Sequence, residues 1–130
     1  MIRRQFLVGL LLGLAGPFSF AMRLERDSFD RPTADRLLRI TGCGPSSAVV
    51  GRCYLQSYPD ERSVTRLVNQ LTADLDLSQS RAPAEIRAAI SVRVRRDFVE
   101  GRTVAVHGWI LSRTEARVSA LAAVSGLGPL

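Results

Sequence analysis

Lysine is missing from this 130-residue sequence, so all 18 of its basic residues are arginine. A phosphate-binding loop of the Walker type is excluded, because that loop needs a lysine to reach the phosphates. Histidine occurs once, as His107, and cysteine only twice, which leaves too few ligands for a zinc site of the usual kind. We therefore expect a chain that binds no metal and no organic cofactor.

Nucleophile motifs are also lacking. The sequence has no G-x-S-x-G turn, the motif that presents a reactive serine in many hydrolases. A Ser-His-acid arrangement around His107 stays formally open, but the residue is equally ordinary in a turn. We expect no catalytic residues, and a small periplasmic hydrolase-like enzyme remains an alternative.

No apolar run is long enough for a typical membrane-spanning helix, which needs about 20 residues. The run Phe6–Ala15 is shorter, follows two arginines and precedes the small residues Ser19 and Ala21. This order is typical of a cleavable signal peptide, and a permanent anchor is the weaker alternative. We place cleavage after about Ala21, which leaves residues 22–130 as a single mature domain in the periplasm.

The start of the chain resembles the twin-arginine export motif. Arg3, Arg4, Phe6 and Leu7 match its R-R-x-F-L pattern, although Ile2 stands where the motif usually has Ser or Thr. An ordinary secretion signal that happens to contain two arginines is the alternative. The twin-arginine machinery carries folded cargo, so the resemblance implies a domain that folds before export, often with a cofactor or a partner subunit.

The excess of positive charge is small. Without the two arginines of the signal, 16 of the 18 arginines remain against 12 acidic residues. The densest basic cluster is Arg93, Arg95 and Arg96, and Asp97 and Glu100 partly cancel it. Nucleic-acid binding requires a clustered basic face, so we interpret this cluster as a solvated helix face and expect no nucleic-acid partner.

Apolar residues recur at helical spacing through much of the mature domain. One helix is expected near residues 34–40, and a second is expected to be capped by Ser46 or Ser47. Asp60 is expected to cap a third helix, with Glu61 in its first turn. The clearest apolar stripe belongs to this third helix: Val64, Leu67, Val68, Leu71 and Leu75. A fourth helix has the stripe Ile86, Ala89, Ile90, Val94 and Phe98.

The spacing changes after the fourth helix. Two short apolar runs flank His107 and Gly108, which is the pattern of a β-hairpin with a two-residue turn. Ser112 and Glu115 then match a capping box, the signal for the start of a helix. The sequence therefore predicts a mainly α, small helical domain with one short β-hairpin before the C-terminal helix.

Cys43 and Cys53 leave two alternatives open. A disulfide is permitted in an oxidising periplasm, and closing a loop of about 15 residues stabilises a chain by ~3 kcal/mol in the chain-entropy model. The other alternative is a pair of small buried thiols.

The last third of the chain carries a recognisable signature. It consists of D-F at 97–98, G-R-x-V at 101–104 and G-W-I-L-S-R-T-E-A-R at 108–117. These residues resemble the C-terminal signature of small proteobacterial proteins that carry twin-arginine signals, although His107 stands where that pattern usually has Asp. The resemblance implies export and a helix–hairpin–helix end, and it implies no activity because the family has none assigned.

Trp109, the single tryptophan, lies on the expected hairpin. It either anchors the core or stands at a partner surface, where tryptophan is favoured. An export signal on a domain without catalytic groups favours a non-catalytic accessory or small-subunit protein. We expect it to dock on a larger exported protein, a periplasmic oxidoreductase, through His107, Gly108 and Trp109. A solute-binding module is a further alternative.

Overall fold

The computed structural model describes residues 30–76 and 81–126. The export motif and the cleavage position after Ala21 lie outside the described residues. Within them the chain is mainly helical, with a two-stranded antiparallel hairpin followed by a C-terminal helix, which confirms the predicted fold class. None of the helices described is long and apolar enough to cross a membrane.

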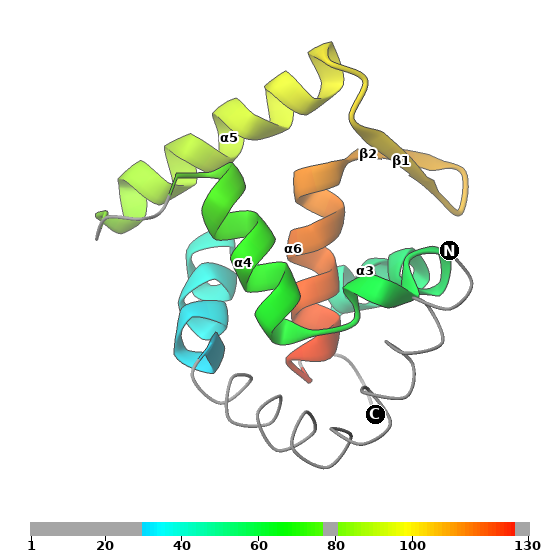
Figure 1. The fold of residues 1–130 in the computed structure, drawn as a ribbon, viewed down its shortest axis with the longest axis horizontal. Coiled ribbons are helices and arrows are strands. Elements are labelled where there is room, and N and C mark those ends of the chain that lie inside the picture. The colour runs from blue at the N-terminus through cyan, green and yellow to red at the C-terminus, as the bar shows by residue number, and fades with distance from the viewer. Residues whose placement is uncertain (1–29, 77–80, 127–130) are drawn as a thin grey trace, which may run out of the picture.

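The elements follow one another with short connections (Figure 1). A helix over residues 30–41 comes first. The others are α3 (Pro45–Ser57), the 3-10 turn η1 (Pro59–Glu61), α4 (Val64–Asp74), α5 (Pro83–Val99), β1 (Thr103–Val106), β2 (Trp109–Ser112) and α6 (Arg113–Val124).

Helix α6 lies in the middle of the domain, with α3, α4 and α5 around it (Figure 1). Its buried residues face several directions rather than one: Thr114, Ala116, Val118, Ala120, Leu121 and Ala122. A helix that is apolar on most of its faces is stable only when it is surrounded. The small alanines let neighbouring helices approach, so α6 is the axis of the core.

Helices α3 and α6 approach each other closely. A Cβ atom added to Gly51 of α3 would lie 1.9 Å from the backbone oxygen of Ser119 on α6. Real Cβ atoms do not come so close to backbone, so only glycine fits at this crossing. Ala48 of α3 and Ala120 of α6 are also fully buried, and the two helices pack nearly backbone to backbone.

The predicted apolar stripe of α4 is confirmed, since all five of its residues are buried. The stripe predicted for α5 is only half right. Ile86 is buried, but Phe98 is 47% exposed, and its neighbour Asp97 is buried instead, at 1% exposure. The last turns of α5 therefore present a charged residue to the core and apolar residues to solvent.

One of the three predicted helix N-caps is confirmed and two are wrong. Ser112 and Glu115 form the predicted capping box at the start of α6. Helix α3, in contrast, begins at Pro45 after Gly44, so neither predicted serine caps it. Ser63 caps α4 in place of Asp60, because residues 59–61 form a separate 3-10 turn before the helix.

Candidate functional site

The hairpin carries the most prominent exposed aromatic residue of the described chain. Val104 and Val106 of β1 are buried, whereas Trp109 and Ile110 of β2 are 74% and 67% exposed. Cross-strand partners share a face of a sheet, and Trp109 pairs with Val106. The pair lies next to the turn, where Val106 reaches the core and Trp109 does not. The alternative that Trp109 anchors the core is therefore wrong.

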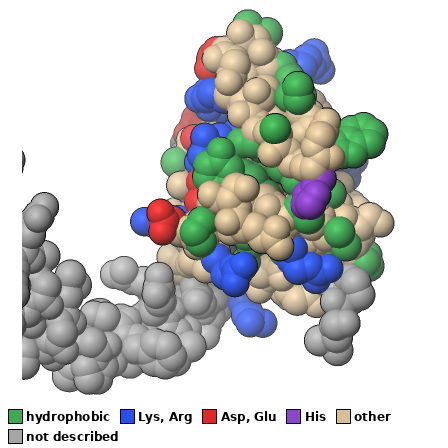
Figure 2. All heavy atoms as spheres, turned by 90° about the vertical axis from the view of Figure 1, so that its right-hand side faces the viewer, with side chains coloured by type: hydrophobic (Ala, Val, Ile, Leu, Met, Phe, Trp, Pro, Cys, Tyr) green, Lys and Arg blue, Asp and Glu red, His purple; other side chains and the backbone are tan. Residues whose placement is uncertain are grey.

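The turn of the hairpin is His107 and Gly108, as predicted. Both have positive φ, 47° and 81°, the backbone of a type I′ turn, whose twist matches that of the strands. We call residues 107–110 the hairpin tip. Figure 2 shows hydrophobic side chains gathered around the histidine on this face of the molecule.

His107 has no catalytic setting. It is exposed, and among the described residues no hydrogen bond or ion pair joins it to a serine or a carboxylate. The described part of the chain also contains no group of three or more His, Cys, Asp or Glu side chains placed to hold a metal ion. The arrangement around His107 therefore gives a hydrolase mechanism no support.

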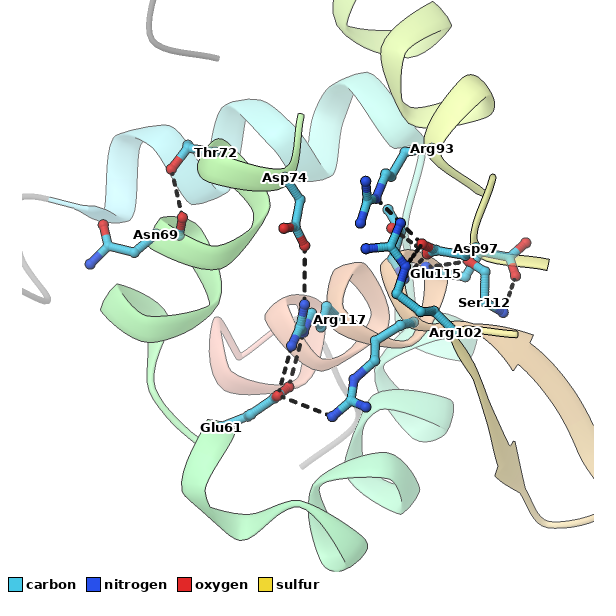
Figure 3. Close-up of polar contacts among 12 residues, drawn as sticks. Glu61, Asn69, Thr72, Asp74, Arg93, Asp97, Arg102, Ser112, Glu115 and Arg117 are labelled. Atoms are coloured by element: carbon cyan, nitrogen blue, oxygen red, sulfur yellow. Dashed lines mark hydrogen bonds and ion pairs between the residues drawn. The ribbon is translucent and has the colours of Figure 1, made fainter. Parts of the chain in front are cut away.

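A first ionic cluster joins η1 to α3, α4 and α6, and we call it the Glu61 cluster. The Tyr54 hydroxyl donates to Glu61 Oε2 at 2.6 Å, and Arg117 Nη2 donates to Glu61 Oε1 at 3.1 Å. Arg117 Nη1 donates to Asp74 Oδ2, also at 3.1 Å. Figure 3 shows Arg117 between the two carboxylates. One guanidinium therefore ties η1, α4 and α6 together.

Tyr54 and Glu61 of this cluster have pKa values shifted away from neutral pH. Burial raises the pKa of Tyr54 to about 12, and the hydrogen bond to Glu61 adds to the rise. Burial would also raise the pKa of Glu61, but hydrogen bonds from Arg117 and Tyr54 outweigh it and hold that pKa below its usual value. A general acid or base should have a pKa near the working pH, so Tyr54 and Glu61 are not suited to proton transfer at neutral pH.

A second cluster surrounds Asp97, and we call it the Asp97 cluster. Asp97 Oδ2 accepts hydrogen bonds from the backbone N–H of Thr114 at 2.9 Å and from its hydroxyl at 2.7 Å. Asp97 Oδ1 lies 3.3 Å from Arg93 Nε and 3.4 Å from Arg102 Nε. Asp97 therefore satisfies an N–H in the first turn of α6 and ties α5 to the hairpin and to α6 (Figure 3).

These clusters correct several predictions from the sequence. Arg93 was expected on a solvated face, but its side chain is only 15% exposed and pairs with Asp97. The side chain of Arg117 is equally buried. Glu61 does not lie in the first turn of α4 and is 7% exposed. The spacing of Arg93 and Asp97, four residues apart on a helix, was the one available signal for such a pair.

The two cysteines are free, half-buried thiols. Cys53 lies in the third turn of α3, about 12 Å along the helix axis from Pro45. A disulfide requires Cα atoms within about 7 Å of each other. The free state of both residues fits the alternative of two thiols.

Comparison with known proteins adds no assignment. No protein-family model, curated protein or solved structure matches this chain. The resemblance over residues 97–117 stays a prediction, and a function has to be inferred from the exposed and buried groups of the described residues.

Proposed function

We propose that this chain is an exported, non-catalytic accessory subunit that docks on a larger periplasmic protein, an oxidoreductase, through its hairpin tip. The observation that carries the proposal is the 74% exposure of Trp109 beside the 67% exposure of Ile110. Exposure of large apolar side chains to water is unfavourable, and covering them by a partner lowers the free energy. Tryptophan is among the residues that contribute most to protein interfaces.

The hairpin is anchored to the core along β1 and at its base, which suits a docking element. Val104 and Val106 are buried in the core. Arg102, just before β1, contacts Asp97, while Ser112 at the end of β2 caps α6. An interface element that is fixed before binding loses little conformational entropy when a partner arrives.

An oxidoreductase is the partner class that the export signal favours. The twin-arginine route carries folded assemblies, and a small domain whose described residues form no catalytic grouping fits the role of a subunit carried with an enzyme. The resemblance of residues 97–117 to exported proteins with twin-arginine signals supports export alone and does not bear on the class of the partner.

Affinity capture from periplasm tests the docking. Trp109→Ala should weaken capture of the partner about thirtyfold, because truncating a buried interface tryptophan costs about 2 kcal/mol or more. Val49→Ala is the matched control, since Val49 is an exposed apolar residue of α3, at 45% exposure, outside the hairpin. It should leave capture unchanged.

Two outcomes would contradict the proposal. If the wild-type protein captures nothing at stoichiometric yield, the accessory role is refuted. If folded Trp109→Ala protein captures the partner as well as the wild type does, the hairpin tip is not the contact. Mass spectrometry of the captured protein decides separately whether it is an oxidoreductase.

Export is tested by replacing the arginine pair. Arg3→Lys together with Arg4→Lys keeps the charge but removes the two residues that define the motif. Fractionation of cells should find the double variant retained in the cytoplasm. Export at the wild-type level would show that an ordinary secretion signal is used, and the argument for a folded assembly would be lost.

A further inference from the structure

A cavity between the two ionic clusters is lined by charged residues alone. Its volume is about 270 Å³, and its walls are Asp74, Arg93, Asp97, Arg102, Arg113 and Arg117. Four guanidinium groups and two carboxylates thus surround one small space. Figure 3 shows Asp74 and Arg117 on one side of this region and Arg93, Asp97 and Arg102 on the other.

Hydrogen-bond donors outnumber acceptors around this cavity. Each guanidinium has five N–H donors, so the four provide about 20, whereas two carboxylates provide about eight acceptor positions. The Nε atom of Arg113 is buried and has no hydrogen-bond partner among the described residues. Those of Arg93 and Arg102 lie 3.3 and 3.4 Å from Asp97 Oδ1 as ion pairs, without the geometry of a hydrogen bond. A buried donor without an acceptor is costly, so a ligand rich in acceptors would be stabilised here.

The net charge of the residues that line the cavity also favours an anionic ligand. Four arginines against two aspartates leave two positive charges in excess on the lining residues. Outside the wall, Glu61 pairs with Arg117 and lies 3.8 Å from Arg113, and it offsets part of this excess. Glu100 pairs with Arg102, but it is 48% exposed, so water screens much of its charge.

We propose that this cavity binds one small oxyanion of the phosphate and sulfate class. Drug-sized ligands need cavities of about 300–1,000 Å³, so the volume of about 270 Å³ suits an inorganic anion rather than a nucleotide. Arg93 and Arg117, each 15% exposed, form the inner wall, and Arg102 and Arg113, at 40% and 34%, stand nearer to solvent. Guanidinium forks bind such oxygens in pairs.

This site is independent of docking, because no residue of the hairpin tip lines the cavity. Its test is isothermal titration calorimetry of the purified protein with inorganic phosphate, at pH 7 in a buffer of low ionic strength without phosphate or sulfate. We expect saturable binding of one phosphate per chain. Sulfate should compete for the site, and chloride at the same ionic strength should not abolish binding.

Two variants and a control make the test specific. Arg113→Gln should weaken phosphate binding at least tenfold, whereas Arg95→Gln should not change it. Arg95 is exposed on α5 and does not line the cavity, so the second variant removes the same charge elsewhere. Asp74→Asn removes a negative charge from the wall and should tighten binding, an effect opposite to the one expected of a variant that merely disturbs the fold.

The proposal would be overturned by a lack of saturable binding to the wild-type protein. It would equally be overturned if Arg95→Gln weakened binding as much as Arg113→Gln, because attraction to net charge would then explain the result. Should Arg113→Gln fail to fold, weaker or unchanged phosphate binding by Asp74→Asn would overturn it on its own.

Discussion

Replacing Gly51 by alanine tests the central packing of the domain. In an ordinary helix interior this change stabilises a protein by roughly 0.5–1 kcal/mol, because glycine loses the most backbone entropy on folding. Here the new Cβ would lie 1.9 Å from Ser119 O and 2.6 Å from Ala120 N. Ordinary contact begins near 3.4 Å, so α3 and α6 must separate by about 1.5 Å.

The cost of this separation outweighs the gain in helix propensity. An extra methylene group in a packed core costs about 1–3 kcal/mol. We expect the upper end, since the atoms in the way belong to backbone and cannot rotate aside. Gly51→Ala should therefore lower the free energy of unfolding by about 2 kcal/mol. For a domain of about 100 residues this lowers the melting temperature by roughly 8–16 °C.

Thermal unfolding followed by circular dichroism measures the effect. Val49→Ala, on the exposed face of the same helix, serves as control and should change the melting temperature little. A melting temperature of Gly51→Ala equal to or above that of the wild type would refute the close approach of α3 and α6, because helix propensity alone would then decide the outcome.

Three further predictions concern capping, pH and metal content. Ser112→Ala removes the fully buried cap of α6 and should cost ~1 kcal/mol in urea denaturation; an unchanged midpoint would contradict the cap. The folded-state pKa of Tyr54 is raised to about 12, so its contribution is present below pH 10 and lost as the pH rises towards 12. The free energy of unfolding should fall by roughly 2–3 kcal/mol between pH 10 and pH 12. Tyr54→Phe, measured in the same urea series, should show a smaller fall. An equally steep fall in that variant would disprove that ionisation of Tyr54 is the cause. Elemental analysis and an absorption spectrum of native protein should find no stoichiometric metal and no chromophore, and either one would disprove the expectation from the sequence.

Local signals in the sequence predicted local structure well. The capping box at Ser112, the turn at His107 and Gly108, and the apolar stripe of α4 each depend on residues within a few positions of one another. Such short-range patterns determine the local backbone structure directly. The fold class followed from them, because helices and hairpin could be placed one by one.

The buried ionic clusters depend on contacts between residues far apart in the sequence, which a local pattern cannot predict. Glu61 meets Arg117 across 56 positions of sequence, and Asp97 meets Thr114 across 17. A charged residue on a helix is usually exposed, so Asp97 was expected beside Arg93 on a solvated face, and Glu61 in the first turn of a helix. Phe98 was wrongly expected in the core. It has the spacing of the apolar stripe, but Asp97 occupies the position that faces the core.

The exposure of the hairpin tip could not be decided from the sequence. Trp109 pairs with the buried Val106. Alternation along a strand predicts which residues lie on the same face of the hairpin, but it does not predict how much of that face the core covers. Whether a strand end is covered depends on where α3, α5 and α6 stop.

The central position of α6 also dictates the order in which the chain can become structured. Helices from residues 30 to 99 are synthesised before the helix that their apolar faces pack against. Until α6 has left the ribosome, it cannot cover those apolar faces, and exposed apolar surface can bind chaperones or aggregate. The core therefore cannot be completed before α6 has been synthesised.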